Sequence, residues 1–333
     1  MESTRLKNIK ILATGGTIAG KAATSTQLTG YTAGAYSVED LLDSVPALHA
    51  LAHISGEQLC NIDSCSMTDA LLLKLSQRSN ELLAQADVDG VVITHGTDTM
   101  EETAFFLNLT VKSAKPVVLV GAMRPATAVS ADGPLNILNA VKVATCADSI
   151  GQGVLVVMND EIYSGRDVTK TNTANVATFK APNAGAIGFI VGGKVRYYYS
   201  SVRPHTLKSE FDVSCVKALP RVDIIYTHVG EDRVLVDAVV GAGAQGIIYA
   251  GSGMGSIHEG AEQALAEAAA KGVSVVRSSR TGSGIVAEGL TRWQEQGFLY
   301  ADNLNPQKAR LLLQLALLKT HERSEVQQMF DKY

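Results

Sequence analysis

The chain has 333 residues, with 46% apolar and 19% charged side chains and a formal net charge of −4 at pH 7. This composition is ordinary for a globular protein, and the acidic balance argues against nucleic acid or an anionic membrane surface as the main partner. The length is sufficient for two domains, and no uncharged apolar stretch reaches the roughly 18 residues that a membrane-spanning helix needs.

The cysteines and histidines show no metal-binding spacing. Cys60 and Cys65 are the nearest pair among the four cysteines, and their separation differs from the C-x₂-C spacing of zinc and redox sites. The seven histidines contain no H-E-x-x-H motif. We therefore expect free thiols, no metal and no cofactor. The N-terminal residues are charged and lead into a strand-like run, so we expect no signal peptide.

The first two-thirds of the chain alternates strand-like and helical patterns. Apolar runs predict strands at 9–13, 90–94, 116–121 and 153–158. Helical periodicity lies between them and predicts helices at 41–52, 69–85, 104–110 and 133–147. This alternation predicts a mostly parallel sheet that is covered by helices on both faces.

Several of these helices have recognisable start signals. Ser37 and Thr68 are N-cap residue types that stand just before two of the predicted helices. Thr99, with Glu102 three residues later, matches a capping box. Pro134 opens the helix that follows Asp132, because proline is favoured in the first helical turn.

The pattern lapses from about residue 199 to 220, where the chain is polar and aperiodic. Strands then follow at 222–228, 246–250 and 273–277, and helices at 234–241, 261–271 and 306–320, before a short amphipathic helix ends the chain. We expect an α/β protein of two domains joined by a linker at 199–220. Residues 1–198 form the larger, N-terminal domain with a flavodoxin-like parallel sheet, and residues 221–333 form a smaller α/β domain.

Two hydroxyl-rich turns follow strands of the first predicted domain. Thr14 ends one strand, and Thr97 with Asp98 follows another, at the carboxyl ends where open α/β sheets bind ligands. A threonine is a poor nucleophile without a base and a proton path, and Lys170 is placed to complete a Thr–Lys–Asp relay. Each of these residues alone is typical of a turn or a solvated loop. Their convergence favours nucleophilic chemistry.

Other motifs are better explained by structural roles than by ligand binding or catalysis. Residues 15–21 match a phosphate-binding P-loop except that Ala22 replaces the hydroxyl that would hold magnesium, and no helical pattern follows. Residues 251–255 have G-x-G-x-G spacing, which predicts a tight turn rather than a dinucleotide site. His95 is expected to be a hydrogen-bonded structural histidine.

Seven segments resemble the bacterial L-asparaginase family of the type II kind, in one order along nearly the whole chain. They are ILATGGTIAG (11–20), ITHGTDTMEET (93–103), VGAMRP (120–125), SADGP (130–134), DVTKT (167–171), VRSSR (276–280) and LNPQKAR (304–310). The resemblance implies hydrolysis of L-asparagine to L-aspartate and ammonia through a threonine acyl-enzyme, with a possible side activity on L-glutamine.

The resemblance also implies roles for individual residues. Thr14 matches the nucleophile, and Thr97, Asp98 and Lys170 match the set that handles protons and orients the attack. The backbone amide at Thr97 is expected to stabilise the oxyanion. Tyr31 matches the tyrosine of a mobile loop that closes over the site and hydrogen-bonds the nucleophile.

The substrate-binding positions depart from the family pattern. Ser64 matches the serine that holds the α-carboxylate, and Asp98 also faces the α-ammonium. Cys65 stands where a glutamine or glutamate normally accepts a hydrogen bond from that ammonium, and a thiol is a weak acceptor. Losing such a charge-assisted bond costs roughly 1.5–3 kcal/mol. Asp63 stands where a small residue is common.

Two further departures fall on positions that the family contributes across a subunit interface. Met254 stands where an asparagine is common. The family has a glutamate where an ungapped reading places Thr291; Glu288 is the nearest carboxylate and takes that position only with a gap. All these changes affect recognition of the amino-acid head group and leave the covalent machinery intact.

The main hypothesis is therefore hydrolysis of L-asparagine with a weakened grip on its head group. The alternatives are an amidohydrolase acting on a different or α-N-modified small amide, and a binding protein, which the intact nucleophile disfavours. The resemblance implies a homotetramer built of intimate dimers. We expect a cytoplasmic location, or a periplasmic one if a signal peptide has been removed; Ser113 stands where some periplasmic relatives have half of a disulfide.

Overall fold

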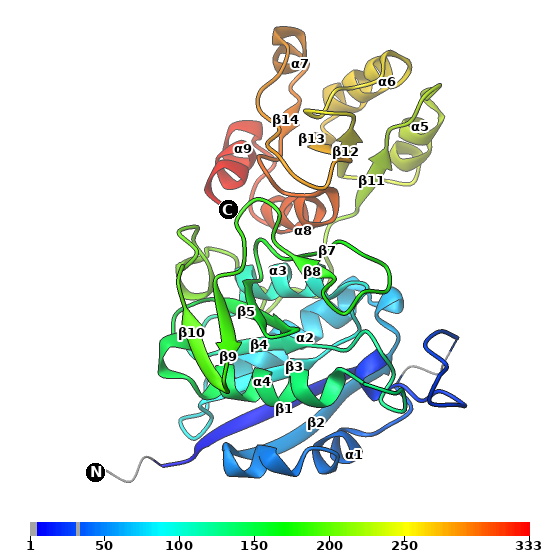
Figure 1. The fold of residues 1–333 in the computed structure, drawn as a ribbon. Coiled ribbons are helices and arrows are strands. Elements are labelled where there is room, and N and C mark those ends of the chain that lie inside the picture. The colour runs from blue at the N-terminus through cyan, green and yellow to red at the C-terminus, as the bar shows by residue number, and fades with distance from the viewer. Residues whose placement is uncertain (1–4, 31–33) are drawn as a thin grey trace. The chain divides into compact units, whose positions relative to one another are not determined.

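The computed structural model describes residues 5–30 and 34–333, and the chain forms two compact units, Met1–Cys215 and Val216–Tyr333 (Figure 1). The polar segment expected as a linker contributes its residues up to Cys215 to the first unit. Within that segment Ser209 Oγ donates to Leu109 O at 2.5 Å, and Lys112 Nζ donates to Ser209 O at 2.6 Å. Phe211, two residues after Ser209, is buried. The domain boundaries given above stay a prediction.

The first unit is built on an eight-stranded sheet in the order β10-β9-β6-β5-β4-β3-β1-β2. The parallel strands are β1 (Lys7–Gly15), β2 (Ala52–Ile62), β3 (Gly90–Thr94), β4 (Val117–Val120) and β5 (Val154–Met158). Antiparallel strands β6 (Glu161–Ser164), β9 (Gly188–Val191) and β10 (Lys194–Tyr197) extend one edge. The order 2-1-3-4-5 of the parallel strands is flavodoxin-like, as predicted. A separate ribbon pairs β7 (Thr169–Lys170) with β8 (Phe179–Lys180).

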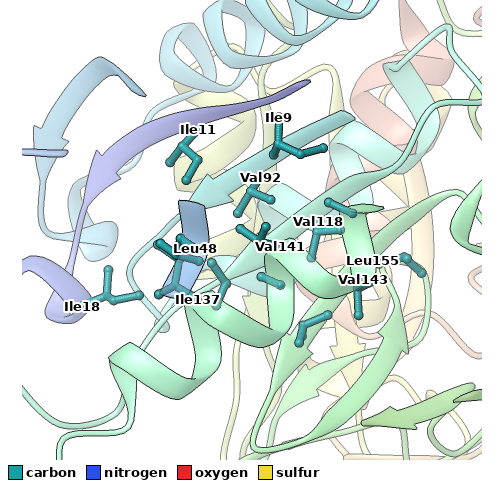
Figure 2. Close-up of a cluster of buried hydrophobic side chains, with 14 of the residues drawn as sticks. Ile9, Ile11, Ile18, Leu48, Val92, Val118, Ile137, Val141, Val143 and Leu155 are labelled. Carbon is teal, nitrogen blue, oxygen red and sulfur yellow. The ribbon is translucent and has the colours of Figure 1, made fainter. Parts of the chain in front are cut away.

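Helices cover both faces of this sheet, as the alternation of strands and helices predicts. On one face Ile9, Ile11 and Val92 pack against α1 (Val38–Asp43) and α4 (Gly133–Thr145), as part of the cluster in Figure 2. On the other face, Leu12 and its neighbours pack against α2 (Asp69–Leu83) and α3 (Met100–Thr110). Because both faces are covered, the central strands are apolar at nearly every position.

The helix predicted at 41–52 is wrong. The chain forms the short α1, a 3-10 turn at Pro46–Ala50 and then strand β2. Pro46 ends helical hydrogen bonding because it has no N–H to donate. The edge strand β2 is half exposed and mostly polar, so its apolar signal is weak.

The cap predictions have mixed outcomes. Ser37 forms a full capping box with Asp40, and Thr68 Oγ1 accepts from Leu71 N at 3.2 Å. The capping box expected at Thr99 is absent, because the side chain of Thr99 makes no cap hydrogen bond. Its hydroxyl donates instead to Ser64 O at 2.9 Å, in a loop that follows β2.

The second unit has a four-stranded parallel sheet of β11 (Val222–Tyr226), β12 (Gly246–Gly251), β13 (Ser274–Ser279) and β14 (Leu299–Tyr300). Helices α5 (Val234–Gly241) and α6 (Glu259–Ala270) pack on the face that carries Ile247 and Tyr249. Helix α8 (Pro306–Leu317) lies on the opposite face, against Gly246, and α7 (Thr291–Glu295) and α9 (Arg323–Lys332) complete the unit. In the described part of the chain, no helix is long and apolar enough to cross a membrane.

Candidate active site

The candidate site lies where the strand order of the first sheet reverses, between β1 and β3. Adjacent loops leave the sheet in opposite directions at such a point, and a crevice opens between them. Gly16, just past β1, has φ +80°, and a Cβ on it would clash with Gly96 Cα. The loops after β1 and β3 therefore touch backbone to backbone, which only glycine permits.

A third loop, the 3-10 turn Ser64–Ser66 after β2, closes against the same point. A Cβ on Gly96 would lie 2.5 Å from Ser64 Oγ. The Ser64 hydroxyl accepts from Asp98 N at 3.2 Å, and Ser64 O accepts from Thr99 Oγ1 at 2.9 Å. Ser64 is 2% exposed, so this serine joins the loops that follow β2 and β3.

Lys170, at the end of β7, brings the expected relay together. Its Nζ donates to Thr97 Oγ1 at 2.9 Å and to Asp98 Oδ1 at 2.6 Å. The backbone N–H of Lys170 donates to Glu101 Oε2 at 2.6 Å. Glu101 is buried in the first turn of α3. The ammonium of Lys170, the hydroxyl of Thr97 and the carboxylate of Asp98 thus form one hydrogen-bonded cluster. A second carboxylate, that of Glu101, holds the backbone of Lys170.

Thr14 lies at the end of β1, one position beyond the residue that pairs with Thr94. It is 2% exposed, and its hydroxyl donates to Thr94 O at 2.9 Å. Among the described residues no hydrogen bond links this hydroxyl to Lys170. Tyr31, the expected lid residue, lies outside the described residues.

A cavity of about 480 Å³ opens beside the cluster. Thr97, Asp98 and Lys170 line it, together with Thr17 and residues 28–30. Asp63, Met123, Arg124, Thr173 and Ala174 complete the lining. Neither Thr14, in the last part of β1, nor Ser64, in the turn after β2, is among the lining residues. The volume is that of a site for a small molecule.

Cys65 does not line this cavity. Its side chain is exposed, and its Sγ lies 3.9 Å from Ser66 Oγ. Asp63, two residues earlier, does line the cavity. The side chain that the resemblance assigns to head-group recognition is therefore not at the cavity, and a neighbouring carboxylate is.

Arg124 and Glu101 are among the lining and supporting residues that the sequence analysis does not single out. Arg124 lies in the VGAMRP segment and Glu101 in the ITHGTDTMEET segment, where only Thr97 and Asp98 are predicted site residues. Motif membership was the available signal. It does not distinguish a residue that faces the cavity from one that supports it.

His95 is a structural histidine, as predicted. Its Nδ1 lies 2.7 Å from Gly96 O, which can only accept, so Nδ1 carries the proton. Its Nε2 then accepts from Thr103 Oγ1 at 2.9 Å. Complete burial lowers the pKa of His95 to about 4, so the ring stays neutral at physiological pH.

The other glycine motifs have no nucleotide-binding context. A three-residue 3-10 turn, Thr17–Ala19, follows Gly16 where a P-loop would need a helix. Residues 252–256 form a tight antiparallel bridge. No cluster of three potential ligands in the described part of the chain is arranged for a metal, and all four cysteines are free.

The departures predicted in the second unit lie on different elements of that unit. Met254 is 63% exposed on the turn after β12. Thr291 is the first residue of α7. Arg277, which is fully buried and stacked over Trp293 at 4.7 Å, donates to the backbone carbonyl of Glu288. The loop that carries Glu288 is therefore held by a buried guanidinium.

Comparisons with known proteins agree along the whole chain. A family model described as "Asparaginase, N-terminal" matches residues 8–203, and one described as "Glutaminase/Asparaginase C-terminal domain" matches residues 221–330. The chain is 51% identical to L-asparaginase 2 of Bacillus subtilis (strain 168) over 332 residues, which is 100% of this chain and 88% of that protein. It is 46% identical to the glutaminase-asparaginase of Pseudomonas fluorescens biotype A, over 99% of this chain and 91% of that protein. The crystal structure of a probable cytoplasmic L-asparaginase from Campylobacter jejuni superposes with a TM-score of 0.96 at 49% identity, over 98% of this chain and 100% of that one.

Proposed function

This chain belongs to the asparaginase family, and we propose that it hydrolyses the side-chain amide of L-asparagine to L-aspartate and ammonia through a threonine acyl-enzyme. It is an amidohydrolase of the L-asparaginase class. The observation that carries the proposal is the cluster of Thr97, Lys170 and Asp98 that opens into a cavity at the switch point of the sheet.

In the first half of the proposed reaction, Thr14 is the nucleophile. Its Oγ forms a bond to the amide carbon, the C–N bond breaks, and the hydroxyl proton is transferred to the departing ammonia. Tyr31 and the cluster of Thr97, Asp98 and Lys170 carry this proton. The backbone amide of Thr97 stabilises the negative charge that develops on the amide oxygen.

In the second half, water replaces ammonia. Its oxygen bonds to the acyl carbon, the bond to Thr14 Oγ breaks, and the water proton returns to that oxygen. The Thr97 hydroxyl supports this step because it both lines the cavity and accepts from Lys170 Nζ at 2.9 Å. A fixed proton path of this kind needs no metal or organic cofactor.

Substrate range and assembly extend this proposal. The glutaminase-asparaginase relative supports a side activity on L-glutamine. We propose a homotetramer of intimate dimers and a cytoplasmic location. The likeness to the probable cytoplasmic L-asparaginase of Campylobacter jejuni and the four free cysteines support that location, and a periplasmic one is the alternative.

Ammonia release tests the function directly. We expect release from L-asparagine, weaker release from L-glutamine, and a Thr14→Ala variant that binds L-asparagine but no longer turns it over. The α-N-blocked asparagine is the control substrate. Turnover of the blocked amide in preference to L-asparagine would instead establish the alternative, an amidohydrolase for α-N-modified amides.

A further inference from the structure

We propose that Asp63 binds the α-ammonium group of the substrate, in place of the side chain that Cys65 cannot supply. The inference rests on the proposed function, because it concerns how an amino-acid amide is recognised at the same cavity. It assigns a specificity-determining role to a residue that lies one position before Ser64.

The first observation is where the two side chains lie. Asp63 lines the cavity with Thr97, Asp98 and Lys170, whereas Cys65 does not. The backbone at Asp63 is held on both sides of the turn: Asp63 O accepts from Ser66 N at 2.9 Å, and the next residue, Ser64, is buried beneath the loop after β3. A short carboxylate on a fixed backbone is well suited to orient a ligand.

The second observation is the balance of charge around the cavity. Asp63 and Asp98 are acidic, and Arg124 and Lys170 are basic. Asp98 Oδ1 is already paired with Lys170 Nζ at 2.6 Å, and Arg124 Nη1 donates to Ser130 O at 2.8 Å. The carboxylate of Asp63 has no hydrogen-bond or ion-pair partner among the residues that the structure describes.

These observations together identify the ligand chemistry. An unpaired carboxylate on a residue that lines a cavity for a small molecule is matched by an ammonium group. An amino-acid amide supplies that ammonium, whereas an α-N-acylated amide supplies only a neutral N–H. Asp63 therefore favours substrates with a free α-amine, which opposes the relaxed specificity that Cys65 alone predicts.

The test compares L-asparagine with succinamate, the same amide without the α-amine. For Asp63→Asn, we expect kcat/KM for L-asparagine to fall roughly ten- to a hundredfold, the value of one charge-assisted hydrogen bond, mostly through KM. The kcat/KM for succinamate should stay within about twofold of wild type, because that substrate has no ammonium to lose. Asp43→Asn, which removes an exposed carboxylate from the end of α1, is the matched control and should change neither value.

Two results would overturn the inference. One is an equal loss on both amides, which would mean that Asp63 only supports the loop. The other is a selective loss of L-asparagine activity in Cys65→Ala and not in Asp63→Asn, which would place the contact on the thiol. Failure of the proposed function is seen separately, as wild-type protein that releases ammonia from neither L-asparagine nor L-glutamine.

Discussion

Glu101 holds the backbone of Lys170, the lysine of the proposed proton relay. Its Oε2 accepts from Lys170 N at 2.6 Å, while the Lys170 side chain reaches Thr97 and Asp98. We predict that Glu101→Ala lowers kcat at least tenfold, because the ammonium loses its alignment and the partly buried backbone N–H of Lys170 loses its acceptor. Glu101→Gln keeps an acceptor oxygen and should recover most of the rate.

Steady-state kinetics on L-asparagine check this positioning role. The expected signature is a fall in kcat with KM little changed, and rescue by the amide variant. If Glu101→Gln is as slow as Glu101→Ala, the charge of Glu101 matters and the residue does more than position Lys170.

His95 predicts a pH dependence of stability rather than of catalysis. Its pKa is lowered to about 4 by burial, from an ordinary value of 6.5, so the unfolded chain takes up this proton at higher pH than the folded one. The contribution of neutral His95 is fully present above pH 6.5 and is lost as the pH falls toward 4, by up to roughly 3 kcal/mol.

Denaturant unfolding at pH 7 and pH 4.5 measures this effect. His95→Gln should show a smaller loss of unfolding free energy between the two pH values than wild type does. His321→Gln, at an exposed histidine, is the matched control and should behave as wild type. An equal loss in all three proteins would show that His95 does not carry the effect.

Individual site residues could be predicted from the sequence only where they lie in a polar turn that follows a strand. Thr97, Asp98 and Lys170 follow strands or sit in polar loops, and the structure brings them into one hydrogen-bonded cluster. Asp63 lines the cavity and Cys65 does not, and this difference depends on a 3-10 turn of three residues, which leaves no periodic pattern in the sequence.

At the scale of elements, Gly96 is the point where three loops meet. A Cβ there would lie 2.5 Å from Ser64 Oγ and 2.7 Å from Ser64 Cβ. We predict that Gly96→Ala destabilises the fold by about 1–3 kcal/mol, as overpacking does. The variant should also have a lower kcat/KM than the fraction of unfolded protein explains, because the added Cβ pushes apart the loops that carry Ser64 and Thr97.

Gly241→Ala is the matched control, because a Cβ on that glycine meets nothing within 4 Å. Thermal unfolding and kinetics at a temperature where both variants are folded give the comparison. Full activity in a folded Gly96→Ala variant would show that the close approach of these loops is not needed for catalysis.

The central strands could be predicted from the sequence because burial on both faces makes them apolar at nearly every position. Strand β2 could not, because its edge position leaves half of its residues exposed and polar. The antiparallel strands β6, β9 and β10 were missed for a similar reason: each has only four residues, too few to show a period. The capping box predicted at Thr99 does not form because the Thr99 hydroxyl donates instead to Ser64 O, a tertiary contact that the local sequence does not reveal.

At the scale of the whole molecule, the sequence indicates two α/β units with a mostly parallel sheet in the first, and the structure has both. The number of copies in the assembly is a separate prediction, which comes from the resemblance. If the proposed homotetramer forms, light scattering should give four times the 35.1 kDa mass of the chain at micromolar concentration. A monomer with full asparaginase activity would refute the proposed assembly.

Formation of the acyl-enzyme on Thr14 is the step on which the proposed reaction depends. The direct measurement is peptide mass spectrometry after rapid acid quenching of the enzyme during turnover of L-asparagine. We predict an added aspartyl group on the peptide that contains Thr14, and none in the Thr14→Ala variant. An aspartyl group on the peptide that contains Thr97, whose hydroxyl is the one in contact with Lys170, would contradict it.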